Sequence, residues 1–288
     1  MEMFASFGRT WNIAKICWGI LQKDRELVVF PILTGVGMVI WASILGGLTV
    51  MTGAMDRLQA SGGDAGELTS TDLALLFIAY FGMSFLIIYF NTALVGAAMI
   101  RIRGGDPTLS DGFGISNRRL PQILGWALIS ATVGLLLRLL RQAARDNMIG
   151  QIVLALVGGV WSYLTFFVVP VIVVEGSGPI GAIKRSSALF KKTWGEQFVA
   201  NFGFGLLFIG AVILGAIPAF LIAAISPVVG IAVAVVTVGG AAAIVSSLEG
   251  IFKAALYVYA AENVVSSEFP ADALRTSYTQ PGAARGII

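Results

Sequence analysis

Long hydrophobic stretches, separated by short clusters of charged residues, run along most of the sequence. Asp, Glu, Lys and Arg are absent between Glu26 and Asp56, and again between Asp72 and Arg101. A charged side chain at the centre of a bilayer costs about 2.5–3.5 kcal/mol, so charges mark the ends of membrane-spanning helices. The uncharged stretches reach or approach the ~20 residues that cross about 30 Å of hydrocarbon. The pattern predicts six spans, at about residues 28–51, 73–100, 121–140, 152–174, 198–224 and 228–260.

The last two predicted spans share one uncharged stretch, from Glu196 to Glu249, which is too long for a single helix. Pro227 divides it, because proline disfavours a helical residue before it and suits the first turn of the next helix. We therefore expect the chain to turn at Ser226-Pro227.

The stretch before the first span has the periodicity of an amphipathic helix. Phe4, Trp11 and Trp18 recur at intervals of seven residues, whereas the polar and basic residues fall mainly elsewhere on the helical wheel. This pattern is typical of a helix that lies in the membrane interface with its aromatic side toward lipid and its basic side toward headgroups. We expect such a helix at about residues 4–22.

Two later stretches repeat this plan. At about residues 179–194, apolar residues that include Phe190 share one face, and Lys and Arg residues crowd the remaining surface. At about residues 107–119 the pattern is weaker, and Thr108 and Asp111 have the spacing of a capping box at a helix start. The order in-plane helix, span, span is therefore expected three times.

Composition supports lipid as the solvent of this chain. Hydrophobic residues make up 57% of the 288 positions and charged residues only 12%, about half the usual share. A water-soluble globule of this size could not bury that much apolar surface. We expect an all-α fold, a polytopic bundle of six transmembrane helices with in-plane amphipathic helices on the cytoplasmic side. It should form a single membrane domain over residues 1–265, followed by a flexible cytoplasmic tail at residues 266–288.

The distribution of basic residues predicts orientation and partners. Fourteen Lys and Arg residues fall on one side of the predicted topology and four on the other. Because Lys and Arg concentrate in cytoplasmic loops, both termini are expected in the cytoplasm, with the protein in the cell membrane. The expected partners are the bilayer, anionic lipid headgroups and another membrane protein. Nucleic acid is not expected, because the sequence has no basic patch interleaved with stacking aromatic residues. Headgroup contacts are predicted for Arg9, Lys15, Arg118, Arg119, Lys184, Arg185, Lys191 and Lys192.

Several stretches carry a resemblance to a known family: KDRELVVFP, LSDGFGISNRRLPQILGWALISATVGLLL, IKRSSALFKKTWG, FKAALYVYA and FPADALRTSY. In these stretches the chain resembles a family of prokaryotic six-span membrane proteins whose function has not been assigned. The Lys-Arg-Ser stretch that ends in Trp-Gly is also similar to the membrane domain attached to some glycerophosphodiester phosphodiesterases, but the sequence contains no phosphodiesterase domain. The resemblance implies the membrane fold and no catalytic residues.

Few side chains in the sequence can perform chemistry. The chain contains no His, which excludes imidazole bases and metal ligands, and its single Cys17 cannot form an intramolecular disulfide. No paired carboxylates fall on a clearly common buried face. We predict no catalytic, cofactor-binding or metal-binding residues, and we expect the protein not to be an enzyme.

Four polar residues inside the spans are the candidate intramembrane site. Glu249 and Lys253 lie four positions apart in the favourable order for a helical ion pair. They either form an ion or substrate relay inside the bundle, or neutralise each other near the inner interface. Asn91 and Asn201 are weaker candidates, which interhelical hydrogen bonding would explain.

Two main functions fit these observations. The first is a non-enzymatic integral membrane protein, either a structural component or a partner of a membrane complex. The alternative is a small transporter or channel that uses Glu249 and Lys253, supported by Pro31, Pro170 and Pro218 within the spans. A lipid-modifying enzyme ranks third, because it would need a carboxylate cluster or a nucleophile near the headgroups.

Overall fold

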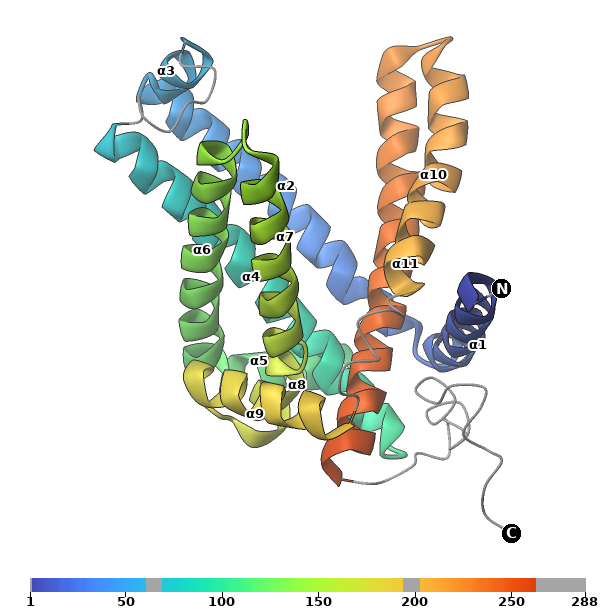
Figure 1. Cartoon of the computed structure of the whole chain (residues 1–288). Helices are drawn as coiled ribbons and strands as arrows, with labels where there is room; N and C mark the ends of the chain where they lie inside the picture. Colours follow the sequence, from blue (N-terminus) through green and yellow to red (C-terminus); the bar gives the residue numbers. More distant parts are fainter. Residues whose placement is uncertain (1, 61–68, 194–202, 263–288) are drawn as a thin grey trace. The chain divides into compact units, whose positions relative to one another are not determined.

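The computed structural model describes residues 2–60, 69–193 and 203–262, and over these ranges the chain is helical, with no strand (Figure 1). The prediction of an all-α fold is confirmed for these residues. The helices in chain order are α1 (Glu2–Lys23), η1 (Arg25–Val28), α2 (Val29–Met51), α3 (Ala54–Ala60), α4 (Ser70–Ile102), α5 (Leu109–Arg118), α6 (Leu120–Ala143), α7 (Met148–Thr165), α8 (Val168–Glu175), α9 (Pro179–Thr193), α10 (Gly203–Ala223) and α11 (Pro227–Glu262).

Long apolar helices identify a multi-pass membrane protein. Among the described residues, five helical segments are long and apolar enough to cross a membrane: Arg25–Met51, Ser70–Ile102, Leu120–Ala143, Met148–Glu175 and Pro227–Glu262. They coincide with the first, second, third, fourth and sixth predicted spans. The fifth predicted span begins at residue 198, outside the described residues, and its described part is the apolar helix α10.

The three predicted amphipathic segments at residues 4–22, 107–119 and 179–194 are the helices α1, α5 and α9. Each precedes a pair of long apolar helices or helical segments, as the sequence pattern predicts. The presence and order of these helices are therefore confirmed for the described residues, and the in-plane, amphipathic role of α1, α5 and α9 stays a prediction.

The chain divides into two compact units. The first comprises the described parts of residues 1–32, 91–115 and 188–288, and the second comprises those of residues 33–90 and 116–187. The predicted tail at residues 266–288 lies outside the described residues, and a single membrane domain over residues 1–265 stays a prediction.

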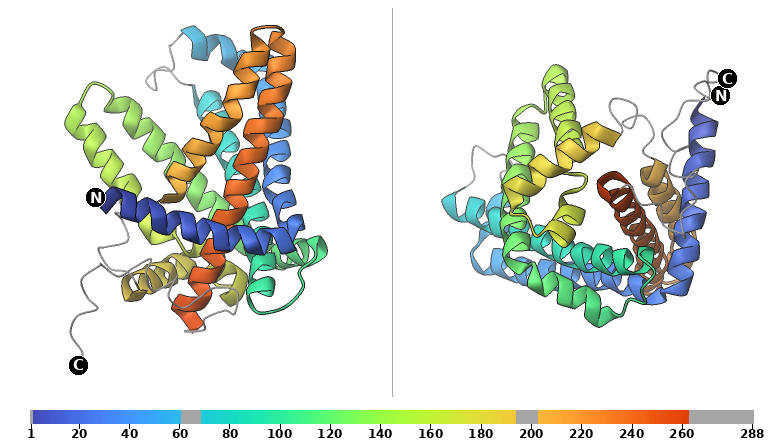
Figure 2. Two further views of the ribbon diagram at one scale, coloured as in Figure 1. Left: turned by 90° about the vertical axis from the view of Figure 1, so that its right-hand side faces the viewer. Right: turned by 90° about the horizontal axis from the view of Figure 1, so that it is seen from below.

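In the first unit, α10 and α11 form a long antiparallel hairpin, and α1 runs across it (Figure 2). The Thr237 hydroxyl donates a 2.6 Å hydrogen bond to the Gly215 carbonyl. At Gly230, a Cβ would come within 2.5 Å of Ala223, so the absence of a side chain lets the helices approach closely. The C-terminal half of α11 is largely buried, whereas most large apolar side chains of its N-terminal part are exposed.

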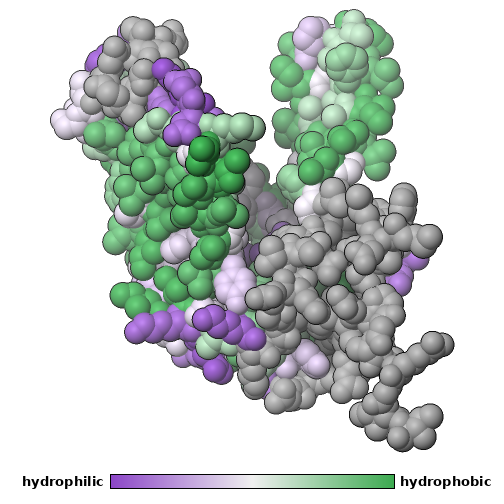
Figure 3. Space-filling view, in the orientation of Figure 1, coloured by the Kyte–Doolittle hydropathy of each residue, from purple (hydrophilic) through white to green (hydrophobic). Residues whose placement is uncertain are grey.

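In the second unit, α6 and α7 form an antiparallel hairpin in which the Trp126 and Trp161 rings stack with centroids 5.7 Å apart. α2 approaches α4 where Trp41 lies over Gly82, and the Trp41 Nε1 donates to the Ala79 carbonyl at 3.3 Å. The visible face of the α6–α7 hairpin is hydrophobic, and hydrophilic residues gather at its two ends (Figure 3). This distribution is expected for a hairpin that crosses a bilayer.

The fourth predicted span consists of two helices, α7 and α8, with a break at Phe166 and Phe167. Pro170 causes the break, because it has no N–H to donate to the Phe166 carbonyl and its ring displaces that carbonyl. At the break, the Phe167 N–H donates to the hydroxyl of Ser186 in α9, at 2.9 Å. Ser186 is fully buried, so a side chain from α9 satisfies the backbone at the interruption.

Candidate functional site

An ion-pair cluster in the first unit joins the end of α1, the end of α4 and the loop before α5. The Arg101 Nε and Nη2 donate to the two carboxylate oxygens of Asp24, and Nη2 also donates to Asp106 at 2.5 Å. Asp24 is only 6% exposed, whereas the Asp106 side chain is 91% exposed. A bidentate pair of this kind is strong and directional. It holds the last turn of α4 against the segment that leads into α2.

Helix α5 is attached to the same region by Glu26 and Phe30. A Glu26 carboxylate oxygen accepts a 3.1 Å hydrogen bond from the backbone N–H of Leu109, at the start of α5, where a negative charge is favourable. The Phe30 ring meets Phe113 edge to face at 5.4 Å, and a Cβ at Gly112 would lie 2.4 Å from Phe30. The sequence stretches KDRELVVFP and LSDGFG therefore pack against each other.

Two capping boxes begin the helices α4 and α5. The Asp111 carboxylate accepts from the Thr108 N–H at 2.9 Å and from its hydroxyl at 2.7 Å, and the Thr108 hydroxyl accepts from the Asp111 N–H at 3.2 Å. The capping box predicted for these residues is therefore confirmed. Thr69 and Asp72 make the same three contacts in the second unit.

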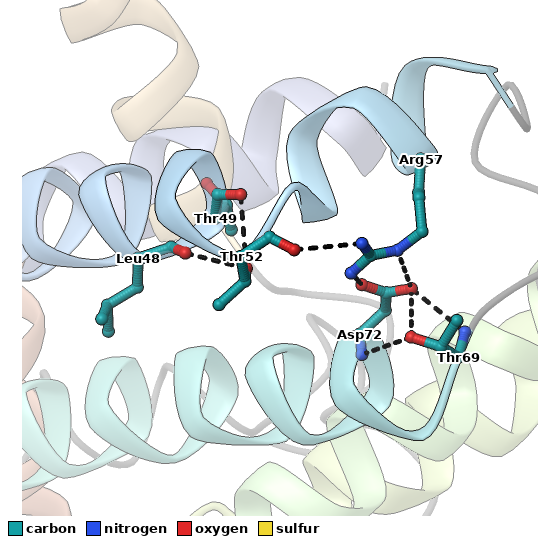
Figure 4. A network of polar contacts seen from close by, with 6 residues as sticks. All are labelled: Leu48, Thr49, Thr52, Arg57, Thr69 and Asp72. Atoms are coloured by element: carbon teal, nitrogen blue, oxygen red, sulfur yellow. Dashed lines mark hydrogen bonds and ion pairs between the residues drawn. The ribbon is translucent and has the colours of Figure 1, made fainter.

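Arg57 extends the Thr69–Asp72 box into a larger network (Figure 4). Its Nε and Nη2 donate to the Asp72 carboxylate at 3.2 and 2.7 Å, and its Nη1 donates to the Thr52 carbonyl at 3.0 Å. The Asp72 side chain is buried and that of Arg57 is 40% exposed. The hydrogen bond to Asp72 raises the pKa of Arg57, so this guanidinium stays charged. The network ties α3 to the neighbouring ends of α2 and α4.

Arg119 and Gln122, at the start of α6, bind the C-terminal end of α8. Arg119 donates to the Val173 carbonyl at 3.3 Å and to the Val174 carbonyl at 3.4 Å, and the Gln122 Nε2 donates to the Gly176 carbonyl at 3.2 Å. Carbonyls at a helix C-terminus lack intrahelical partners and carry partial negative charge, so a guanidinium there is stabilising. Gly176 ends the helix in the left-handed conformation, at φ 62°.

The basic residues predicted to contact headgroups fall into three groups. Five have exposed side chains: Lys15, Arg118, Lys184, Arg185 and Lys191, of which Arg185 also donates to Glu175 at 2.7 Å. Arg119 is partly buried and binds the backbone of α8, as described. The side chains of Arg9 and Lys192 lie outside the described residues. Headgroup contact stays a prediction for all eight.

The predicted pair inside the last span is present within α11. The Lys253 Nζ and a Glu249 carboxylate oxygen are 2.7 Å apart, and the two side chains are 23% and 37% exposed. Ser247, two positions before Glu249, donates to the Ala243 carbonyl of its own helix. Asn91 of α4 lies beside α11, since its side-chain oxygen is 3.9 Å from the place that a Cβ at Gly250 would take. The structure therefore brings Asn91 to the stretch of α11 that carries the pair.

The remaining candidates for chemistry are few. Asn201 lies outside the described residues. Within the described ranges, no three His, Cys, Asp or Glu side chains are grouped so that they could hold a metal ion. Cys17 is fully buried in α1, and burial raises the pKa of its thiol.

Helix α1 presents two different faces. Among its described side chains, Ile13, Ala14, Cys17, Ile20 and Leu21 are buried, and the helix packs on α11 and α10. Trp11 and Trp18 are 48% and 43% exposed, and the Lys15 ammonium lies 5.8 Å from the centre of the Trp11 ring. The helical periodicity is confirmed, but Lys15 lies beside an aromatic side chain, not on a separate basic side.

Several of these residues are not among those predicted from the sequence. The spacing of Thr69 and Asp72 is a capping-box signal that would have found the second box. Asp24 and Arg101 are 77 positions apart, and no local pattern identifies them as partners. Ser186 lies in the stretch predicted as a basic amphipathic helix, and nothing in that pattern indicates that its hydroxyl binds the backbone of the preceding span.

Comparison with known proteins identifies the family. Residues 70–267 match the model of the Family of unknown function (DUF6159). The chain belongs to this family. No curated protein and no solved structure matches the chain.

The DUF6159 match extends from the start of α4 past the end of α11. It includes Asn91, Arg101, Arg119, Glu249 and Lys253. The tryptophan-bearing face of α1, Asp24 and Glu26 precede it. Membership in DUF6159 agrees with the resemblance to a membrane-protein family without an assigned function, and it brings no activity to the chain.

Proposed function

We propose that this DUF6159 protein is a non-enzymatic integral membrane protein that serves as a structural component or partner of a membrane complex. The observation that carries the proposal is the use of charge at the helix ends. Arg57, Arg101 and Arg119 each bind carboxylates or carbonyls of other helices or loops. Groups held in this way connect the ends of apolar helices, which is what a membrane-embedded frame requires.

The same proposal places the helices in the membrane. Six spans, with α10 as the described part of the fifth, would leave both termini in the cytoplasm, as the bias of fourteen Lys and Arg against four supports. The helices α1, α5 and α9 would then lie along the cytoplasmic interface. In α11, Glu249 is 22 residues beyond Pro227, about 33 Å at 1.5 Å per residue, which is close to the full hydrocarbon thickness. That length supports a position of the Glu249–Lys253 pair at the inner interface.

A transporter or channel is the second candidate, because the fourth span is interrupted at Phe166–Phe167 and broken helices often line substrate sites. Against this reading, the Phe167 N–H is already bound by Ser186. Glu249 and Lys253 are also paired within one helix. Reconstitution into vesicles, followed by flux measurements with a panel of ions and small solutes, separates the two functions. We expect no flux above that of empty vesicles.

The existence of a protein partner is tested with the chain expressed at its natural level in its own membrane. The tagged full-length chain is extracted with a nanodisc-forming polymer and sized by native mass spectrometry. We expect a discrete assembly heavier than the 30.3 kDa chain, with a second membrane polypeptide at fixed stoichiometry. A homogeneous species that contains this chain alone would contradict the partner, and reproducible solute flux would favour the second function.

A further inference from the structure

The exposed face of α1 carries an aromatic and basic surface formed by Trp11, Lys15 and Trp18. These residues are spaced by four and three positions, so they follow one another along one side of the helix. The Lys15 ammonium lies over the Trp11 ring at 5.8 Å, within the range of a cation–π contact. We call these three residues the Trp-Lys-Trp face.

The orientation of α1 in its own unit favours lipid on this face. The α10–α11 hairpin lies on the other side of α1, where it covers Ile13, Ala14 and Cys17 among others. The helix runs across the hairpin (Figure 2), so a membrane-spanning α11 places α1 in the plane of an interface. Tryptophan is enriched at this depth, because its ring combines apolar area with an N–H donor.

The basic residues of α1 favour a lipid with an anionic headgroup. Between Met3 and Lys23 the sequence contains basic residues and no Asp or Glu. Asp24, which follows, is bound by Arg101. Lys15, in the middle of this stretch, has an exposed side chain, and Glu26, the first exposed carboxylate after it, accepts from the Leu109 N–H at the start of α5.

We propose that the Trp-Lys-Trp face binds the phosphate headgroup of an anionic phospholipid in the cytoplasmic leaflet. The ammonium of Lys15 pairs with the phosphate, and the Trp11 and Trp18 rings lie against the glycerol and upper acyl-chain region on either side. This proposal rests on the in-plane, cytoplasmic position of α1 given above.

The test uses tryptophan quenching in the full-length protein. Nanodiscs are prepared with phosphatidylglycerol or phosphatidylcholine that is brominated near the headgroup end of one acyl chain. Subtracting the signal of a Trp11→Phe/Trp18→Phe variant isolates the two rings from the other tryptophans. We expect brominated phosphatidylglycerol to quench more strongly than phosphatidylcholine at equal mole fraction. Lys15→Gln should lower the relative binding constant for the anionic lipid about fivefold.

Arg138→Gln is the matched control, because it removes one exposed positive charge from the predicted opposite side of the membrane. It should leave the preference unchanged, and an equal loss in both variants would show a general charge effect and overturn the site. Equal quenching by the two lipids would overturn the anionic site but leave α1 at the interface. No quenching by either lipid would instead contradict the position of α1 itself.

Discussion

Arg101 and Asp24 form a bidentate ion pair that joins the last turn of α4 to the end of α1 across 77 positions of sequence. The carboxylate is almost completely buried, and the guanidinium is also bound to an exposed second carboxylate, Asp106. A charge pair in this environment is costly to separate, because removing one partner leaves the other without compensation. The pair should therefore be sensitive to the loss of either partner.

Asp24→Asn should lower the free energy of unfolding by about 3 kcal/mol. Asp106→Asn removes the exposed partner of the same guanidinium and should cost less than about 1 kcal/mol. Unfolding in mixed micelles of increasing SDS fraction, followed by circular dichroism, measures both changes. Equal losses in the two variants would contradict the burial of the Asp24 contact.

Ser186→Ala should destabilise the second unit by about 1–3 kcal/mol, because the Phe167 N–H would lose its partner in a buried place. The neighbouring variant Ser187→Ala is the control, since that hydroxyl bonds to a carbonyl of its own helix and its residue is only partly buried. We expect a change within about 0.5 kcal/mol for the control. The same SDS titration reports both values, and an unchanged midpoint for Ser186→Ala would show that the helix break needs no side-chain support.

Glu249→Gln and Lys253→Met should each lower stability slightly, by up to about 1 kcal/mol, because the paired side chains are partly exposed. The double variant should recover part of the loss, since neither charge is then left alone. Thermal unfolding in nanodiscs measures the cycle, and flux assays on the same preparations should show no change. A stable double variant that abolishes a measurable ion flux would support the transporter instead.

Cys17 should be inert in the folded protein, because its side chain is inaccessible and burial raises the pKa of the thiol, which keeps it protonated. N-ethylmaleimide should leave the native chain unlabelled at neutral and mildly alkaline pH and should label it fully in SDS. In a Cys17→Ala background, Asn12→Cys places a thiol on the exposed side of the same helix and should react at once. Rapid labelling of native Cys17 would contradict the packing of α1 on its unit.

Reporter fusions after residues 62 and 186 should report opposite sides of the membrane, with the second in the cytoplasm. The reason is the excess of Lys and Arg in the loops that share a side with residue 186. Paired fusions to alkaline phosphatase and to a fluorescent protein measure the two locations. Finding both residues on one side would refute the six-span topology.

The long helices of this protein could be predicted from the order of its residues. A charged side chain in hydrocarbon has a high free energy, so the positions of the charged residues indicate where each span begins and ends. The predicted span at residues 28–51 is the helix Val29–Met51, and the one at residues 228–260 is Pro227–Glu262. The Thr108–Asp111 cap was predictable for a different reason, because both partners lie within one helical turn.

Contacts between residues far apart in the chain could not be predicted and are known only from the folded structure. A periodic pattern shows which side chains share a face, but it does not show what covers that face. In α1, for example, the face that includes Ala14 and Leu21 is buried in protein, whereas Trp11 and Trp18 are exposed. Arg101 binds the carboxylate of Asp24 because the packing of the helices brings the two together. The Ser186 hydroxyl accepts from the Phe167 N–H, at the break before α8, for the same reason. No repeating pattern in the sequence predicts such contacts, because each involves a single side chain whose partner depends on how the helices pack.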